Sequence, residues 1–483
     1  MLRTALVTGS AGFIGYFTSQ ALLAQGWNVI GLDAMTDYYD VELKKRRHEM
    51  LSKSKNFTAV TERLETPGLL SSLFEQHKFD AVIHLAAQAG VRYSIDAPRS
   101  YVESNLVGTF ELLEAARAFP PAHMLLASTS SVYGANTQMP YTENDKVDTQ
   151  MSFYAATKKA TEVMAHSYAH LYHLPITMFR FFTVYGPWGR PDMAHFKFTK
   201  AIIEGDPIEI YNHGKMKRDF TFIDDLVRGI VALIDAVPPM PDTGATPIEN
   251  DSLSPVAPHR AVNIGTGSPV QLLDFVQAIE TAIGIDAQKI FMDIQPGDVP
   301  GTWAEASLLK SLTGEAPVTP IGTGIQAFVD WYRDDPADLA DANRSFEVAG
   351  SVFGAAPRAL TGTISLQQTV DLVRLSIEVV ERRLDRNDAF DQPGDLRQQF
   401  LADRHREVFA DVLQVLHLVA ELARLSNLAG VEDLGVADVG QLLFHLVGTE
   451  PDQLGGISPR PTEQVGCNLR LLRRISDLVE PID

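Results

Sequence analysis

The sequence has almost no cysteine and no long hydrophobic run. Cys467 is the only cysteine, which excludes an internal disulfide framework and any metal site built from several cysteines. No apolar stretch reaches the ~18 residues that cross a bilayer, and the chain starts with a strand-like segment, Thr4–Val7, instead of a signal peptide. Basic residues are also in deficit, 41 against 61 acidic ones, for a formal net charge of -20 at pH 7. These features predict a cytoplasmic protein with no membrane segment, and they argue against general nucleic-acid binding.

A glycine pattern lies between the first strand-like segment and a helical one. Gly9 permits a tight turn, Gly12 lets a pyrophosphate approach the backbone, and Gly15 allows the helix to pack closely. The N-terminus of that helix then faces the phosphates. A second strand, Val29–Asp33, ends in a carboxylate that can accept hydrogen bonds from the adenosine ribose. Because no arginine closely follows Asp33 to bind a 2'-phosphate, the pattern favours NAD over NADP.

Three more strand-like segments, Ala81–Leu85, Met124–Ser128 and Ile176–Arg180, alternate with helical patterns. This alternation predicts an α/β fold with a Rossmann-type, doubly wound parallel sheet, whose ligand crevice lies at the carboxyl ends of the strands. The segments after those ends are therefore candidate site segments. They are the small-residue stretch Ala86–Ser94 and the hydroxyl-rich turn Ser128–Gly134.

Tyr154 and Lys158 are the candidate proton-transfer pair. They are four residues apart, so on a helix both side chains can point into one cleft. A free phenol has a pKa of about 10, and we expect the ammonium group of Lys158 to lower the pKa of Tyr154 toward the range where it exchanges a proton with a sugar hydroxyl. Because such pairs are common on solvated helices, the assignment of Tyr154 and Lys158 to proton transfer depends on the nucleotide-binding pattern that precedes them.

Charged loops follow in the next part of the chain. Arg190 lies in a turn-rich loop, Thr183–Met193, and Arg218 belongs to a cationic patch in an otherwise acidic chain, where its guanidinium can fork two phosphate oxygens. The segment Pro238–Arg260 is rich in Pro, Asp, Ser and Thr, which predicts a long surface insertion.

Together these motifs resemble the extended short-chain dehydrogenase/reductase superfamily and, within it, the UDP-glucuronate 4-epimerases. The resemblance is carried by Tyr38–Lys44, His84–Ser94, Phe181–Met193 and Gly214–Thr221, and it covers residues 1 to about 335. It implies an NAD-binding Rossmann domain over residues 1–337, with an interleaved smaller α/β substrate-binding region mainly at 183–215 and 264–337. It also implies a tightly held NAD that is recycled, a UDP-sugar substrate and a homodimer.

The resemblance assigns roles to individual residues. Tyr154 is the base that removes the C4 hydroxyl proton of the sugar, Lys158 tunes it, and Thr129 assists at the sugar oxygen. The residues implied to contact the cofactor are Gly9, Gly12, Phe13, Ile14, Gly15, Asp33, Leu85, Ala86, Ala87, Asn105, Tyr154 and Lys158. Those implied to contact the substrate are Arg92, Ser130, Ser131, Thr183, Arg190, Arg218 and Asp298. No metal site is expected.

The implied reaction interconverts UDP-glucuronate and UDP-galacturonate through a 4-keto sugar, which is a β-keto acid prone to lose carbon dioxide. Carbon dioxide is lost when the breaking bond aligns with the carbonyl π system. Ser131, Thr183 and Arg190 are expected to hold the sugar carboxylate away from that alignment. Dehydrating and decarboxylating members of the family supply a carboxylate in the turn where this chain has Thr129, Ser130 and Ser131, so plain epimerisation is favoured. The alternatives are a UDP-glucuronate decarboxylase and a neutral UDP-hexose 4-epimerase. Glu62 stands where the family usually has an Asp near the adenine, and it is not included in the predicted set.

The resemblance ends near residue 338. No lysine occurs after Lys310, and apolar residues recur at helical spacing between Leu366 and Leu384 and between Phe409 and Leu422. These patterns predict an all-α extension over residues 338–483, whose histidines have no metal-site spacing. A protein partner for this extension is one hypothesis. A further alternative, of another class, is a non-catalytic nucleotide-sugar sensor that signals through the extension.

Overall fold

The computed structural model describes residues 2–241, 243–244, 248–294 and 300–334. The predicted helical extension and the predicted substrate residue Asp298 lie outside the described residues. Both therefore remain predictions.

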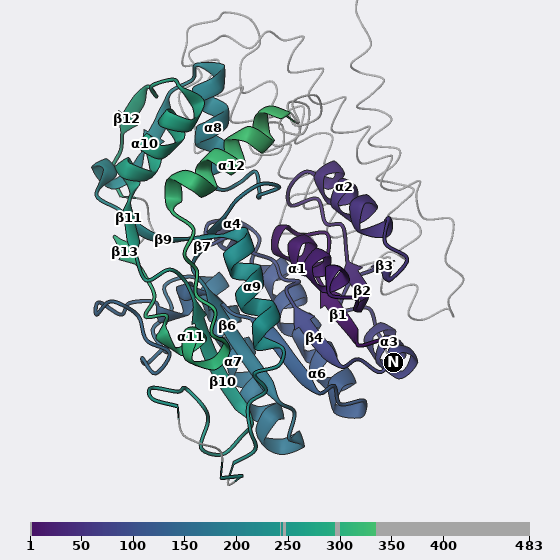
Figure 1. Ribbon diagram of the computed structural model, residues 1–483. Coiled ribbons are helices and arrows are strands. Elements are labelled where there is room, and N and C mark those ends of the chain that lie inside the picture. The colour runs from purple at the N-terminus through teal and green to yellow at the C-terminus, as the bar shows by residue number, and fades with distance from the viewer. Residues whose placement is uncertain (1, 242, 245–247, 295–299, 335–483) are drawn as a thin grey trace, which may run out of the picture. The chain divides into compact units, whose positions relative to one another are not determined.

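The main sheet has seven parallel strands in the order β10-β6-β5-β4-β1-β2-β3 (Figure 1). Its strands are β1 (Thr4–Thr8), β2 (Asn28–Asp33), β3 (Phe57–Thr61), β4 (Ala81–His84), β5 (His123–Ala127), β6 (Ile176–Phe181) and β10 (His259–Ile264). β1 and β4 are paired neighbours, and the strand order reverses between them. The connections that leave their carboxyl ends therefore run in opposite directions and leave a crevice there. The predicted Rossmann-type sheet is confirmed.

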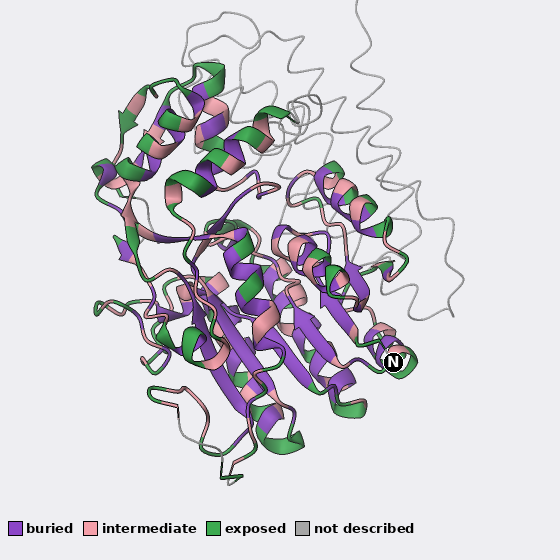
Figure 2. Ribbon diagram, viewed as in Figure 1, coloured by how far each residue is buried: buried purple, intermediate pink, exposed green. Residues whose placement is uncertain are grey.

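Helices cover both faces of this sheet. One hydrophobic core joins the sheet to α1 (Phe13–Ala24), α2 (Val41–Ser52), α9 (Ile223–Leu233) and α11 (Ser307–Thr313). A second core joins the other face to α3 (Leu69–His77), α6 (Gly108–Ala118) and α7 (Phe153–Tyr172). Figure 2 shows the inner strands of the main sheet as almost wholly buried and the helices as buried on one side only, whereas the edge strand β3 is largely exposed. A strand covered on both faces is mostly apolar, as the fully buried β4 and β5 illustrate, each with a single histidine.

A smaller region forms around a third core. Strands β7 (Thr183–Tyr185), β11 (Pro269–Gln271) and β13 (Gly301–Thr302) all pair with β9 (Lys217–Phe222), and β8 (Ile208–Ile210) pairs with β12 (Lys289–Phe291). The helices of this region are α8 (Ala194–Glu204), α10 (Leu272–Ile283) and α12 (Ile321–Asp334). Its central strand, β9, lies outside both segments that the sequence assigned to the substrate-binding region.

The seventh strand of the main sheet was not predicted. The expected surface insertion Pro238–Arg260 ends inside β10, because His259 and Arg260 pair with Ile176 and Thr177 of β6. Among the described residues before that point, from Pro238 to Pro258, there is no helix or strand.

Short helical segments complete the described part of the chain. They are α4 (Tyr93–Asp96), α5 (Pro98–Tyr101), η1 (Val102–Val107), η2 (Ser130–Tyr133) and η3 (Tyr211–Gly214). Across the described residues, no helix combines the length and the apolar character needed to cross a membrane.

Candidate active site

In the glycine turn after β1, backbone atoms lie so close to neighbouring segments that only glycine fits. Gly9 has a φ of +72°, and a Cβ at this position would come within 2.8 Å of the backbone nitrogen of Ala86 after β4. A Cβ at Gly15 would come within 2.0 Å of the carbonyl oxygen of Gly9. The third glycine is thus required by the turn itself, whereas the sequence argument attributed it to packing of the helix on the sheet. Helix α1 follows with Gly12 as its N-cap and no side chain capping it.

Asp33 ends β2 beside this turn. One carboxylate oxygen accepts a hydrogen bond from the backbone N–H of Ala11 at 3.0 Å, and the other from the N–H of Met35 at 2.9 Å. The carboxylate is buried and held in place, and each oxygen has further lone-pair capacity for a ribose hydroxyl. The glycine turn, the helix N-terminus without a side-chain cap and this carboxylate therefore fit a dinucleotide.

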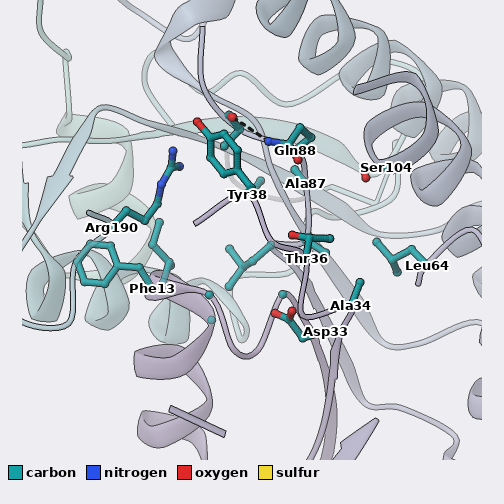
Figure 3. Close-up of a pocket in the computed structure, with 18 of the residues that line it drawn as sticks. Phe13, Asp33, Ala34, Thr36, Tyr38, Leu64, Ala87, Gln88, Ser104 and Arg190 are labelled. Carbon is teal, nitrogen blue, oxygen red and sulfur yellow. Dashed lines mark hydrogen bonds between the residues drawn. The ribbon is translucent and has the colours of Figure 1, made fainter. Parts of the chain in front are cut away.

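One pocket joins these groups to the candidate proton-transfer pair. Figure 3 shows part of its lining, including Phe13, Asp33 and Arg190. Among the predicted residues, those that line it are Gly9, Gly12, Phe13, Ile14, Gly15, Asp33, Leu85, Ala86, Ala87, Thr129, Tyr154, Lys158 and Arg190. The sequence separates these positions by up to 181 residues, and the carboxyl ends of β1, β2, β4, β5 and β6 bring them together.

The side chain of Tyr154 lines this pocket and is partly exposed to it. Burial raises the pKa of Tyr154, while a hydrogen bond from Thr129 and the positive charge of Arg190 act to lower it. The predicted sign was wrong, because the cost of burying a phenolate exceeds the stabilisation by the surrounding groups. The predicted source was also wrong, because the cation that acts on this phenol is Arg190. The hydroxyl of Thr129, in the turn after β5, thus acts on the phenol, and it also donates to the hydroxyl of Ser131 at 3.3 Å.

Lys158 is buried at the next turn of α7. Its ammonium group donates a hydrogen bond to the carbonyl oxygen of Ala127, at the end of β5, at 2.8 Å. Burial lowers the pKa of Lys158 to about 8, and the carboxylate of Glu162 acts against that decrease. Lys158 is thus fixed to the sheet edge in the pocket wall.

Arg190 reaches the pocket from the loop between β7 and α8. Its guanidinium is forked by Asp192, with Nε 3.0 Å and Nη2 2.6 Å from the two carboxylate oxygens. It lies 5.7 Å from the ring of Tyr38, whose hydroxyl donates to Asp192 at 3.3 Å. Figure 3 shows Arg190 and Tyr38 next to each other at one side of the pocket. This pairing fixes a partly exposed cation near Tyr154, where a substrate carboxylate can meet it.

Asn105 does not line the pocket, although it was predicted to contact the cofactor. Its amide accepts from the N–H of Gln88 at 2.8 Å and donates to the carbonyl of Gln88 and the hydroxyl of Thr157, both at 3.1 Å. It therefore links the loop after β4 to α7. Asn105 lies within the single π-helical turn η1, a local widening that is frequent at functional sites.

The other predicted substrate residues also lie outside this pocket. Ser130 and Ser131 begin η2, where the N–H of Ser131 donates to Thr129. Thr183 pairs with Phe220 between two pocket residues, Phe182 and Val184. The guanidinium of Arg92 lies 5.2 Å from the ring of Tyr211, and Arg218 donates to the carbonyl of Lys217. A role in substrate binding stays a prediction for each of them.

Several pocket residues were not predicted. Lys44 lines the pocket near Asp33, donates to Thr36, and has a pKa lowered to about 8 by burial. Tyr38, Gln88 and Glu62 also line it. Tyr38, Lys44 and Gln88 belong to stretches that carry the family resemblance, which was the only available signal, because nothing in their spacing places them at the crevice.

A parallel sheet with a dinucleotide-binding turn, a ribose-binding carboxylate and a tyrosine and lysine pair at the carboxyl ends of its strands defines an enzyme of the short-chain dehydrogenase/reductase type. The chain belongs to the NAD dependent epimerase/dehydratase family, whose model matches residues 5–244. Within the described residues, no group of three His, Cys, Asp or Glu side chains is arranged to hold a metal ion.

Similar proteins narrow this assignment. A probable UDP-glucuronate 4-epimerase of Rhizobium meliloti (strain 1021) is 53% identical over 328 residues, which is 68% of this chain and 96% of that protein. UDP-glucuronate 4-epimerase 4 of Arabidopsis thaliana is 46% identical over 334 residues, covering 68% of this chain and 75% of that protein. The crystal structure of UDP-glucuronic acid 4-epimerase from Bacillus cereus with UDP-glucuronic acid and NAD has a TM-score of 0.61 at 33% identity, covering 68% of this chain and 99% of that one. The family inferred from the sequence motifs is confirmed over about the first two thirds of the chain.

Proposed function

We propose that this protein is an NAD-dependent 4-epimerase that interconverts UDP-glucuronate and UDP-galacturonate. One observation carries the proposal: Thr129 and the Arg190 guanidinium both act to lower the pKa of the Tyr154 phenol, in the pocket that also contains the dinucleotide-binding turn. A base, a hydroxyl and a carboxylate-binding cation are the groups that oxidation and reduction at C4 of a uronic acid need. The relatives named above support the same substrate.

Tyr154 takes the proton of the C4 hydroxyl and later returns it. Thr129 stabilises the phenolate by donating a hydrogen bond. The ammonium group of Lys158 is positioned in the same wall of the pocket by its hydrogen bond to Ala127. The backbone of Gly9, Gly12 and Gly15 and the carboxylate of Asp33 would hold NAD, which supplies the acceptor for the hydrogen leaving C4 and gives it back. The sugar then has a ketone at C4. It rotates in the pocket, and the ketone is reduced on its opposite face.

Arg190 holds the sugar carboxylate during this interval. A carboxylate beside a ketone leaves as carbon dioxide when the breaking bond aligns with the carbonyl π system, and a bidentate ion pair resists that rotation. Asp192 keeps the Arg190 guanidinium oriented through hydrogen bonds from Nε and Nη2, so the other N–H of Nη2 and the two of Nη1 are directed rather than free to rotate. The clamp therefore favours epimerisation over decarboxylation.

The test is product analysis by NMR. Purified protein incubated with UDP-glucuronate is expected to yield UDP-galacturonate without consuming added NAD. UDP-pentose and carbon dioxide would instead show a decarboxylase, and turnover of UDP-glucose with none of UDP-glucuronate would show a neutral epimerase. Binding of the UDP-sugar without any product would favour the sensor.

We also infer a homodimer that associates through α6 and α7. These helices pack against each other on one face of the sheet and expose apolar side chains, with Phe110 45% and Val163 58% accessible. Exposed apolar side chains on two adjacent helices are typical of a surface that pairs with a second copy.

A further inference from the structure

Arg47 is completely buried, although the pocket does not include it. It lies on α2, and it forms none of the ion pairs among the residues that the structure describes. Burying an arginine without a carboxylate is costly, so its hydrogen bonds have to compensate for the lost hydration. The positions of those hydrogen bonds indicate what the residue does.

The guanidinium of Arg47 joins three segments that are far apart in the sequence. Nη1 donates to the carbonyl oxygen of Ala11 in the glycine turn at 2.9 Å and to the hydroxyl of Tyr39 at 3.0 Å. Nη2 donates to the carbonyl oxygens of Trp188 at 2.5 Å and Gly189 at 3.3 Å. Three of the four acceptors are backbone carbonyls, so the contact fixes the course of the chain on both sides.

The loop that Arg47 holds is strained just before Arg190. Trp188 has a φ of +56°, a left-handed conformation that is unfavourable for a bulky side chain and persists only where contacts enforce it. Arg47 binds the carbonyl of that residue and of the next one. The neighbouring Arg46 adds a second contact, with its guanidinium 5.4 Å from the Trp188 ring. Helix α2 thus sets the geometry from which the Arg190 side chain starts.

We propose that Arg47 is a positioning residue that couples the glycine turn to the Arg190 loop, so that retention of the dinucleotide and recognition of the sugar carboxylate depend on one buried guanidinium. The turn and the loop both line the pocket, and Arg47 braces them from behind through Ala11 and Gly189. This inference rests on the proposed function for the identity of the carboxylate. The part that concerns the dinucleotide does not depend on the sugar.

The experiment compares Arg47→Lys and Tyr39→Phe with wild type and with Lys45→Met. Arg47→Lys keeps the charge but cannot reach all four acceptors, and Tyr39→Phe removes one acceptor only. Lys45 is exposed on the same helix and pairs with Glu42, so Lys45→Met is the matched control. Thermal unfolding verifies that each variant folds. NAD occupancy after gel filtration and the calorimetric affinities for UDP-glucuronate and UDP-glucose are the two readouts.

For Arg47→Lys we expect NAD affinity to fall about tenfold and the preference for UDP-glucuronate over UDP-glucose to fall by about the same factor, each corresponding to ~1.4 kcal/mol. Tyr39→Phe should give a smaller loss in both, and Lys45→Met none. A folded Arg47→Lys protein with unchanged NAD occupancy, or with reduced occupancy but an unchanged sugar preference, would overturn the coupling. If wild type itself does not prefer UDP-glucuronate, the proposed substrate fails, and NAD occupancy alone decides whether Arg47 braces the glycine turn.

Discussion

At the scale of the residue, the site depends on how burial changes individual side chains. Tyr154 has its pKa raised by burial and Lys158 has its pKa lowered to about 8, so both charged forms are disfavoured by the same enclosure. Thr129 and Arg190 act in the opposite direction on the phenol. The pKa of the phenol is therefore set by burial and by Thr129 and Arg190, from two other segments, and the spacing between Tyr154 and Lys158 does not reveal either of them.

The role of Tyr154 is tested by Tyr154→Phe. We expect turnover to fall by about 10²- to 10⁴-fold, the usual contribution of a general base, while UDP-sugar affinity stays within about threefold. The measurement is kcat by chromatographic product analysis and affinity by calorimetry. Tyr168→Phe, on the same helix but hydrogen-bonded to Glu114 outside the pocket, is the control. An unchanged rate in Tyr154→Phe would refute the assignment of the base.

Arg190→Gln tests the carboxylate clamp. The substitution removes the charge and the fork, so the sugar carboxylate is freer to align with the ketone, and we expect the fraction of UDP-pentose and carbon dioxide among the products to rise about tenfold. Arg190→Lys keeps the charge without the bidentate geometry, so we expect its fraction of decarboxylated product to lie between those of wild type and Arg190→Gln. A product ratio equal to that of wild type in both variants would contradict the role of Arg190.

At the scale of the element, buried polar networks fasten the strand ends that carry the site. Glu162 on α7 accepts hydrogen bonds from Ser128 at the end of β5 and from Arg180 on β6, at 2.6 and 2.9 Å. Arg180 also donates to the carbonyl of Glu143, whose carboxylate accepts from the N–H of Asn263 on β10. The network connects α7, which carries Tyr154 and Lys158, to three adjacent strands.

Glu143 gives this network a measurable pH dependence. Burial raises the pKa of Glu143 to about 7, so the folded protein holds this proton more tightly than the unfolded chain does. The resulting stability is fully present below the unfolded pKa of about 4.5 and is lost as the pH rises through 7. Glu143→Gln keeps the acceptor for Asn263, and we expect it to unfold at a higher temperature than wild type at pH 8. The corresponding difference in the free energy of unfolding is about 2–3 kcal/mol at pH 8 and shrinks toward pH 5. Identical pH dependence of the unfolding temperature in the two proteins would contradict the shift.

The sequence predicted those elements that local residue patterns determine. Alternating strand and helix patterns located β1, β2, β4, β5 and β6, and the glycine turn with Asp33 located the dinucleotide site. Strand β10 was missed because it follows a long loop and is recognised only by pairing with β6. Arg47 and Lys44 were missed because a cationic stretch on a helix usually faces solvent, and only the folded chain shows that they turn inward. Asn105 was assigned to the cofactor, whereas its amide is occupied by Gln88 and Thr157.

At the scale of the whole molecule, the family similarity and the described structure both cover about the first two thirds of the chain. The proposed catalytic residues and the glycine turn all lie within that part. We therefore expect the epimerase activity to belong to residues 1–337. Phe110 and Val163, which are exposed on the proposed α6 and α7 interface, do not line the pocket.

Val163→Lys tests the dimer. A charge at the centre of an apolar helix pair would have to be buried without a partner, so we expect the variant to elute as a monomer in size-exclusion chromatography with light scattering. Val237→Lys, in the exposed loop after α9, is the matched control and should behave as wild type does. A wild-type protein that is itself monomeric, or a Val163→Lys protein that remains dimeric, would contradict the interface.

The central claim is that one pocket removes a hydrogen from C4 of a uronic acid and returns the same hydrogen to the opposite face. It is tested most directly with UDP-glucuronate carrying deuterium at C4, incubated with the purified protein and analysed by NMR and mass spectrometry. The account predicts UDP-galacturonate that retains the deuterium at C4. UDP-galacturonate that has lost the label to solvent, or a labelled substrate that gives no C4 epimer at all, would contradict it.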